Sequence, residues 1–243
     1  HWGSYLDDVI EHALTRVPYY RSLALPQTAT LSEFPLLTRR MLRERFATLQ
    51  DDGASARPVT TTCTGGSTGE PVWVVHDRLA RQWDYAAEMY FISAMLGMPI
   101  PYYLSHPRVV IWHTRARPRH FLSATDWASR LLKQVTFLEP YTVSSDETLL
   151  RRLQVINRIR PIVIWAYASP LYELARAAKR RNVRVHHPEL IITSVEMLYP
   201  AMRSVIQEVF SCPVRDCYGA VEVRRVAAEC SHGPLHVLAF NAH

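Results

Sequence analysis

Two short, uninterrupted apolar runs in the second half of the sequence constrain the fold most strongly. Residues 161–165 (PIVIW) and 190–193 (LIIT) have almost no polar positions, and amphipathic helical patterns surround them over 145–158, 170–181 and 200–210. Strands that are apolar on both sides are typical of parallel sheets whose two faces are covered by helices. The repeated order of strand and helix therefore predicts an α/β fold with mostly parallel sheets and flanking helices.

Further elements are expected on both sides of this alternating segment. The spacing of apolar and turn-forming residues predicts helices over 4–22, 39–48, 77–97 and 123–132, and strands over 58–62, 71–76, 108–113, 134–138 and 214–217. A chain of 243 residues fits one large domain or two small ones. We expect an N-terminal helical segment over 1–57 that packs on an α/β core over 58–243.

Composition and charge exclude several classes of protein. Hydrophobic residues make up 48% and charged residues 21%, as in ordinary globular proteins. No stretch approaches the ~18 apolar residues of a membrane span, and no apolar signal-peptide core lies near the N-terminus, so we expect a cytoplasmic protein without membrane contact.

The formal net charge of +6 comes mainly from arginines in short pairs, without the basic, aromatic-rich block typical of nucleic-acid readers. We therefore expect no nucleic-acid partner, whereas a basic balance suits a small anion such as a nucleotide.

A glycine-rich loop is the first candidate binding motif. Three of the eight glycines lie within five residues of Thr60–Pro71 (TTTCTGGSTGEP). Glycines let backbone N–H groups approach an anion closely, and the hydroxyls of Ser67 and Thr68 add further donors. No lysine follows Gly69, so the loop is not the P-loop motif, and the glycine spacing is not that of GxGxxG. The loop predicts phosphate binding, with a flexible hairpin as the alternative.

A second motif, Asp216–Glu222 (DCYGAVE), follows the expected strand over 214–217. It combines an aromatic ring at Tyr218, a glycine at Gly219 and a carboxylate at Glu222. In isolation the motif also fits a plain turn from a strand into a loop.

Together the two motifs resemble those of the adenylate-forming (acyl-CoA synthetase-like) superfamily. Its loop pattern, roughly [ST]-[ST]-G-[ST]-T-G-x-P, is matched from Gly66 to Pro71, and its Y-G-x-[ST]-E pattern is matched by Tyr218, Gly219 and Glu222. The chain departs from these patterns at Gly65 and Val221, where the family carries hydroxyl side chains. The resemblance implies ATP-dependent activation of a carboxylic acid as an acyl-adenylate, followed by transfer to CoA or another acceptor.

The flanking segments resemble one branch of this superfamily. Val17–Arg21 (VPYYR), Phe34–Arg43 (FPLLTRRMLR), Glu229-Cys230 and Leu235-His236 are similar to segments of the phenylacetate-CoA ligase and capsule-biosynthesis (CapK-like) branch. The resemblance covers the N-terminal portion of that branch. It implies an aryl or arylacetic acid as the substrate.

The resemblance also implies roles for individual residues. Glu222 and Thr68 are expected to be catalytic, with Mg²⁺ on Glu222. The expected ATP-binding residues are Thr64, Gly66, Ser67, Thr68, Gly69, Glu196, Tyr218 and Gly219, and the expected acid-binding residues are His113, Tyr167 and Ala168. Glu196 alternatively caps a helix, and Cys230 with His236 forms either part of a structural zinc site or a buried thiol beside a surface histidine. Trp112 and Trp165 are expected in the core, with a place in the wall of the acyl pocket as the alternative. Arg224 and Arg225 are expected at the surface, with contact to an acidic substrate group as the alternative.

The resemblance also implies a C-terminal lid with a lysine, which these 243 residues do not contain. We therefore expect a fragment of a longer enzyme, or a shortened relative. A second hypothesis is a non-catalytic module that binds a nucleotide or a partner protein. A third is an enzyme that transfers the acyl group to a carrier protein. A homodimer is a further possible assembly.

Overall fold

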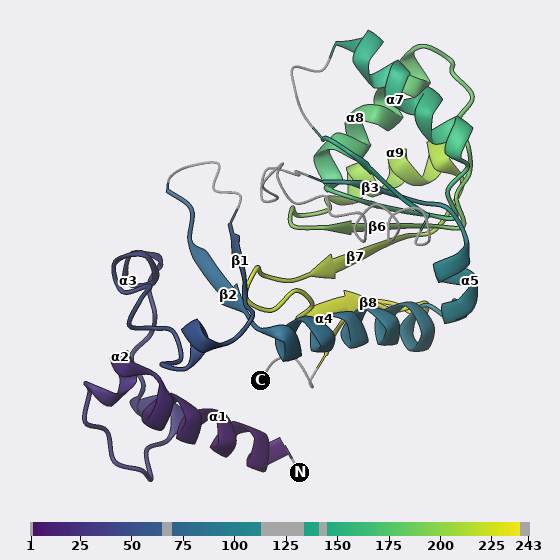
Figure 1. The fold of residues 1–243 in the computed structure, drawn as a ribbon. Coiled ribbons are helices and arrows are strands. Elements are labelled where there is room, and N and C mark those ends of the chain that lie inside the picture. Colours follow the sequence, from purple (N-terminus) through teal and green to yellow (C-terminus); the bar gives the residue numbers. More distant parts are fainter. Residues whose placement is uncertain (1, 65–69, 113–133, 141–144, 239–243) are drawn as a thin grey trace. The chain divides into compact units, whose positions relative to one another are not determined.

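The computed structural model describes residues 2–64, 70–112, 134–140 and 145–238 and divides the chain into two compact units (Figure 1). The first unit contains residues 1–83 and the second contains residues 84–243. The expected division into an N-terminal helical segment (1–57) and an α/β core (58–243) stays a prediction. No helix in the described ranges combines the length and the apolar character that crossing a membrane requires.

The first unit consists of short helices followed by a hairpin. Its elements are α1 (Trp2–Arg16), α2 (Pro18–Arg21), η1 (Leu31–Glu33), α3 (Arg39–Glu44), η2 (Ala54–Ala56), β1 (Thr60–Cys63) and β2 (Trp73–His76). Pro18 divides the helix expected over 4–22, because proline has no N–H to continue the helical ladder. The Thr38 hydroxyl accepts a hydrogen bond from the Met41 N–H and so begins α3, as predicted. β1 and β2 pair antiparallel, with Thr60 opposite His76.

Helix α4 (Arg78–Tyr90) connects the two units along the chain. It continues into the π-helical turn η3 (Phe91–Met95), and the helical segment ends at Gly97 with φ of 72°. Glycine adopts this left-handed conformation without steric cost, which explains the predicted end of the helix at this residue.

The second unit contains a seven-stranded sheet in the order β4-β3-β5-β6-β7-β8-β9. The five strands from β4 to β7 run parallel, whereas β8 and β9 are added antiparallel. The bounds are α5 (Ile100–Ser105), β3 (Arg108–Ile111), β4 (Val135–Leu138), α7 (Asp146–Ile159), β5 (Val163–Ala166), α8 (Ala168–Arg180), β6 (Leu190–Ser194), α9 (Pro200–Phe210), β7 (Val214–Tyr218), β8 (Ala227–Glu229) and β9 (Leu235–Val237). The mostly parallel α/β fold is confirmed.

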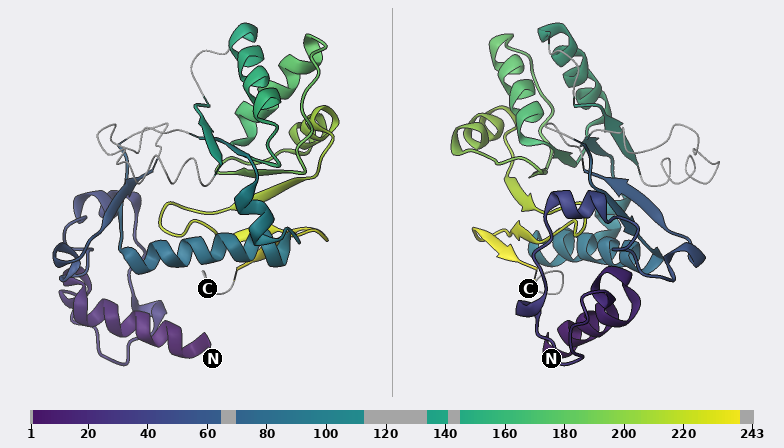
Figure 2. Two further views of the ribbon diagram at one scale, coloured as in Figure 1. Left: turned by 45° about the vertical axis from the view of Figure 1, so that its right-hand side comes forward. Right: turned by 90° about the vertical axis from the view of Figure 1, so that its left-hand side faces the viewer.

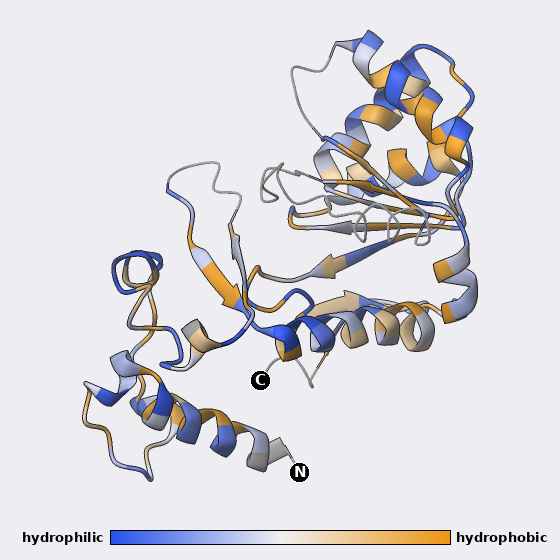
Figure 3. Cartoon of the chain, in the orientation of Figure 1, coloured by the Kyte–Doolittle hydropathy of each residue, from blue (hydrophilic) through white to orange (hydrophobic). Residues whose placement is uncertain are grey.

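Helices cover the parallel part of this sheet on both faces, as its apolar strands require. The larger core cluster packs α7, α8 and α9 against β3, β5 and β6, and a second cluster packs the π-helical turn and α5 against the sheet residues Val163, Leu190 and Ile192. Figures 1 and 2 show α7–α9 together on one side of the strands. Hydrophobic and hydrophilic residues alternate along these helices in Figure 3, which is the pattern of helices with one buried face.

Several elements and residues differ from what the sequence predicted or lie beyond its test. α5, β8 and β9 were not predicted, because each has six residues or fewer and lacks a clear hydrophobic period. The helix expected over 123–132 lies outside the described residues. The surface position expected for Arg225 is wrong, since this side chain is buried, whereas Arg224 is exposed as expected.

Candidate functional site

The carboxyl ends of the parallel strands form the part of the second unit where a ligand is most expected. The chain runs from β3 to its neighbour β4 and then crosses to β5 on the other side of β3. Adjacent strands whose connections leave in opposite directions, here β3 and β5, define a topological switch point. Open α/β sheets commonly bind ligands outside the carboxyl ends of such strands.

Two stacked aromatic rings mark this switch point. Trp112 follows β3 and Tyr167 follows β5, and their ring centroids are 4.6 Å apart with an interplanar angle of 23°. Tyr167 and Ala168 are buried at the start of α8. The third expected acid-binding residue, His113, lies outside the described residues. Trp165 instead packs into the core, with its ring 6.0 Å from that of Phe91, as predicted.

The end of β7 presents an aromatic ring and a carboxylate to solvent. Tyr218 is its last residue and is 62% exposed. Glu222 is also exposed, and no described side chain forms a hydrogen bond or ion pair with its carboxylate. Both groups are therefore free to contact a ligand.

The shape of this loop depends on Gly219. A Cβ atom added at Gly219 would lie 1.8 Å from the backbone oxygen of Arg224. The Ala220 N–H donates to the Val223 oxygen at 2.9 Å, so the loop folds back tightly over the glycine. Gly219 thus acts through close backbone approach, a reason that the motif alone did not show.

Asp216 is a residue that the sequence analysis did not select. Its carboxylate is partly buried and accepts a hydrogen bond from the Thr193 hydroxyl at 2.8 Å. Burial raises the pKa of Asp216, and the nearby Glu229 carboxylate raises it further. Arg203 binds Glu229 through two hydrogen bonds of 2.7 and 2.9 Å, and the positive charge of Arg203 partly offsets the rise in the Asp216 pKa. Asp216 lies two residues before Tyr218 and therefore on the same side of the strand. This spacing was the signal in the sequence that could have identified Asp216 as a site residue.

We predict that Asp216→Asn raises the thermal stability at pH 7 and that this gain disappears as the pH falls below about 4. A raised pKa in the folded state means that folding disfavours the charged carboxylate, and this cost is present only above the pKa of the unfolded chain. An amide oxygen still accepts from Thr193 without carrying charge. Measurements of Tm between pH 3 and pH 8 test this.

A control with the opposite sign is available at Asp146. Hydrogen bonds from Arg180 and Arg181 lower the pKa of that carboxyl. The charged Asp146 carboxylate stabilises the fold above the pKa that this group has in the unfolded chain, and the effect is lost as the pH falls through the lower pKa of the folded state. Asp146→Asn should therefore lower Tm at pH 7. A fall in Tm at pH 7 for Asp216→Asn would contradict the assignment.

Glu196 contacts a helix rather than open solvent. One carboxylate oxygen accepts a hydrogen bond of 2.9 Å from the Ser169 N–H, in the first turn of α8. The structure therefore brings together the loops that follow β5 and β6. The expected place of Glu196 in the ATP site stays a prediction, and the contact with α8 differs from the solvent-facing helix cap that was the alternative.

The glycine-rich loop is described only at its two ends. The Thr64 backbone N–H donates to the Val72 oxygen at 2.9 Å, and the Thr64 hydroxyl accepts from the Val72 N–H at 3.0 Å. Thr64 thus closes the base of the loop. Gly66, Ser67, Thr68 and Gly69 lie outside the described residues.

Cys230 and His236 are brought together, as the zinc hypothesis requires. The Cys230 sulfur and His236 Nε2 are 3.2 Å apart. Structural zinc takes four N or S ligands, and within the described ranges no group of three possible ligands is present. The described residues thus bring together two of the four ligands that such a site needs, and the zinc site stays a prediction.

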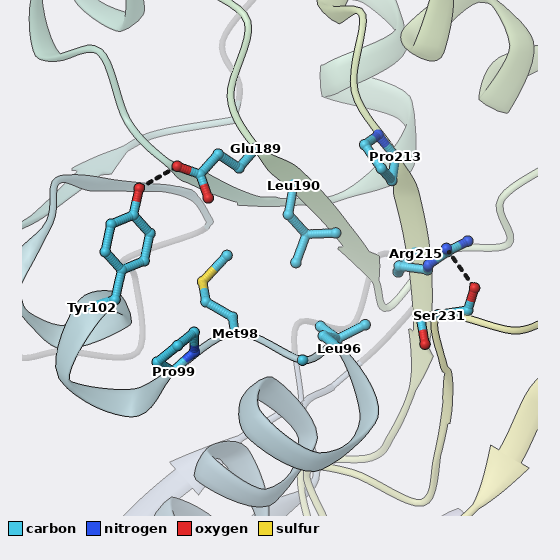
Figure 4. A pocket seen from close by; sticks show the side chains of 10 residues that line it. Leu96, Met98, Pro99, Tyr102, Glu189, Leu190, Pro213, Arg215 and Ser231 are labelled. Atoms are coloured by element: carbon cyan, nitrogen blue, oxygen red, sulfur yellow. Dashed lines mark hydrogen bonds between the residues drawn. The ribbon is translucent and has the colours of Figure 1, made fainter.

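A separate open cavity of about 330 Å³ lies at the amino ends of β6 and β7 (Figure 4). Tyr102 donates a hydrogen bond to Glu189 on one side, and Arg215 donates to the Ser231 backbone oxygen on the other. Since it lies at the opposite ends of the strands from Tyr218, this cavity is not part of the candidate site.

Comparison with known proteins supports the fold. No family model matches the chain. It is 27% identical over 92 residues to protein CapK of Staphylococcus aureus, which is 37% of this chain and 20% of CapK. It superposes on 2-hydroxyisobutyryl-CoA ligase in an open conformation with 2-HIB-AMP and CoA (TM-score 0.67, 16% identity). The same ligase in its thioesterification state gives a TM-score of 0.66 with 17% identity.

The two ligase superpositions cover almost all of this chain. They include 94% and 96% of its residues, but only 52% of the ligase in each case. The chain therefore spans about half the length of the solved structures that it matches.

Proposed function

Because the chain has the fold of the N-terminal portion of an adenylate-forming enzyme, we propose that it binds ATP and a carboxylic acid and activates the acid as an acyl-adenylate. The observation that carries this proposal is the end of β7. There, an exposed Tyr218 ring and a Glu222 carboxylate without a partner among the described side chains lie on either side of the tight turn at Gly219. This arrangement offers one stacking surface and one cation ligand for a nucleotide.

The residues of the second unit have separate roles in this proposal. The Tyr218 ring stacks on the adenine, and Gly219 lets the backbone approach the nucleotide. Asp216 has one oxygen that accepts from Thr193, and its other oxygen is suited to accept a hydrogen bond from the amino group of adenine. Glu222 holds Mg²⁺, which when bound supplies positive charge beside the phosphates.

The glycine-rich loop of the first unit supplies the phosphate contacts. We assign the β- and γ-phosphates to Thr64, Gly66, Ser67, Thr68 and Gly69, through backbone N–H groups and hydroxyls. Thr68 is assigned a catalytic role, since a hydroxyl donor stabilises charge that develops on the phosphates. The pairing of Thr64 with Val72 supports this by fixing the base of the loop.

The reaction requires positioning rather than covalent catalysis by the protein. A carboxylate oxygen of the acid attacks the α-phosphorus, a new O–P bond forms, and the bond from that phosphorus to pyrophosphate breaks. The residues named above orient the nucleotide and stabilise the charge on its phosphates.

We propose an aryl or arylacetic acid as the substrate class. The stacked pair of Trp112 and Tyr167 at the switch point supports this, because aromatic rings favour stacking with another ring. Ala168, the third residue assigned to the acid, is buried at the start of α8 next to Tyr167. CoA is the proposed acceptor, with a carrier protein or an amine as the alternative.

Glu222→Ala tests the site. It should lower acid-dependent exchange of pyrophosphate into ATP by about 100-fold or more, because losing a metal ligand costs several kcal/mol of transition-state stabilisation. Tm should stay unchanged, since the Glu222 carboxylate has no described partner. Glu173→Ala, which removes an exposed carboxylate of α8, is the matched control. Undiminished exchange in Glu222→Ala would remove this residue from the mechanism.

A second candidate function is a nucleotide-binding module without catalysis. The observation that favours it is Val221, since the superfamily pattern has a hydroxyl there and valine can donate no hydrogen bond to a phosphate. Magnesium-dependent ATP binding without pyrophosphate exchange, tested over a panel of acids in the native full-length protein, is the expected result for this alternative.

A further inference from the structure

The turn that follows β6 contains an unfavourable backbone conformation. Val195 has a φ of 76°. Among the described non-glycine residues with a positive φ, Val195 alone has a β-branched side chain. A β-branched side chain in this region is a conformational outlier that persists only when the surrounding structure imposes it. The Val195 side chain is 61% exposed, so its own packing offers little compensation.

Contacts on both sides of Val195 explain how the conformation is imposed. On the N-terminal side, Ser194 belongs to β6 and pairs with Cys217 of β7. On the C-terminal side, the Glu196 carboxylate accepts the hydrogen bond from the Ser169 N–H. The chain must therefore turn within one residue, from a strand position to a fixed side-chain contact.

The contact at Ser169 is a favourable one for a carboxylate. The first N–H groups of a helix have no partner inside the helix, and the N-terminus carries partial positive charge. The N-cap residue of α8, Tyr167, contributes no side-chain hydrogen bond to this end of the helix. Glu196 supplies that missing acceptor from the loop that follows a different strand.

We propose that Glu196 is a positioning residue that holds Val195 in its left-handed conformation and thereby fixes the carboxyl edge of the sheet from β5 to β7. Its hydrogen bond joins the loop that carries Tyr167 to the turn beside β7, which ends at Tyr218. Only the link to ligand binding rests on the proposed function. The coupling between Glu196 and Val195 does not.

This proposal makes a specific statement about coupling. Glycine adopts positive φ freely, so a turn with glycine at position 195 keeps its shape without help from Glu196. A valine at this position needs the contact. The effect of removing the Glu196 carboxylate on ligand binding should therefore depend on which residue occupies position 195.

The experiment compares the wild-type chain with Glu196→Ala, Glu196→Gln, Val195→Gly and the double variant Glu196→Ala/Val195→Gly. An acyl-sulfamoyladenosine, which mimics the acyl-adenylate, is the ligand for calorimetric titration. We expect Glu196→Ala to weaken binding at least tenfold and Glu196→Gln to change it less than threefold, because an amide oxygen also accepts from Ser169. Adding Val195→Gly should recover most of the loss, and an equal loss in the valine and glycine backgrounds would overturn the proposal.

A matched control distinguishes the positioning role of Glu196 from the general effect of removing a carboxylate near a helix N-terminus. Glu147 also lies in the first turn of a helix, α7, and is exposed there in an ion pair with Arg151. Glu147→Ala removes a carboxylate from a helix N-terminus without touching the edge of the sheet. It should leave binding of the adenylate mimic unchanged.

Thermal stability tests the coupling without any ligand. In the protein that retains Glu196, Val195→Gly should raise Tm, because it relieves the strained conformation. In the Glu196→Ala background, Val195→Gly should not raise Tm, since the loss of the Glu196 carboxylate has already allowed the turn at residue 195 to relax. A similar increase in both backgrounds would show that Glu196 does not impose the strain. If wild type binds no adenylate mimic, the proposed function fails, and these Tm values still decide the coupling.

Discussion

Gly219→Ala is expected to disrupt the loop that follows β7. The added Cβ would lie 1.8 Å from the Arg224 oxygen and 2.6 Å from its carbonyl carbon. Both atoms belong to the backbone, so relief requires the loop to move rather than a side chain to rotate. Forced backbone shifts typically cost about 1–3 kcal/mol, and this contact is well below van der Waals distance. We expect a loss of about 3 kcal/mol in the free energy of unfolding and loss of detectable ATP binding.

Urea unfolding and calorimetric titration with Mg-ATP measure these two effects. Gly97→Ala is the control, because a Cβ there meets no atom within 4 Å although φ is 72°. Its expected cost is about 1 kcal/mol, from backbone conformation alone. If Gly219→Ala were as stable as Gly97→Ala and bound ATP normally, the close approach of residue 224 would not be essential.

Arg225→Met is expected to destabilise the second unit by about 2–3 kcal/mol, because it leaves the partly buried Glu88 carboxylate, whose side chain is 29% exposed, without its cation. Arg225 is 8% exposed, and its guanidinium donates to Glu88 at 2.8 Å. It also lies over the Trp165 ring, 5.2 Å from the centroid. Tyr103 donates to the other oxygen of Glu88 at 3.0 Å, so Glu88 joins α4 to the sheet and α5.

Two further variants identify the cause of this loss. Glu88→Gln in the Arg225→Met background should recover more than half of the lost stability, since it removes the uncompensated charge. Arg224→Met is the matched control at the adjacent position, where an exposed arginine pairs with Asp84 at 3.3 Å. It should cost less than about 1 kcal/mol. Chemical denaturation of the wild type and the three variants gives these losses, and equal losses for the two arginines would contradict a special contribution from the ion pair of Arg225 with Glu88.

The fold was largely predictable because its strongest signals are local. The runs at 161–165 and 190–193 became β5 and β6, which are buried on both faces as continuous apolar runs require. Ser145 begins α7 by accepting from the Thr148 N–H, and such capping is visible in sequence. β8 and β9 were not predicted, since their pairing depends on partners outside each strand.

The candidate site was predictable in part, through short motifs. Tyr218, Gly219 and Glu222 were selected because they match the Y-G-x-[ST]-E pattern of the adenylate-forming superfamily, and their roles stay predictions. Asp216 was missed, because its importance comes from Thr193 on the neighbouring strand and from the Glu229 carboxylate. No periodicity in the sequence indicates such a contact between strands.

What the sequence by itself determined is the set of local elements and the motif residues. Apolar periodicity and capping residues act over a few positions, and the resulting preferences can be read along the chain. Tertiary structure alone decided that Arg225 is buried while Arg224 is exposed, and that Glu196 caps α8. Burial and hydrogen bonding at these residues depend on atoms that are distant in sequence, and only folding brings those atoms together.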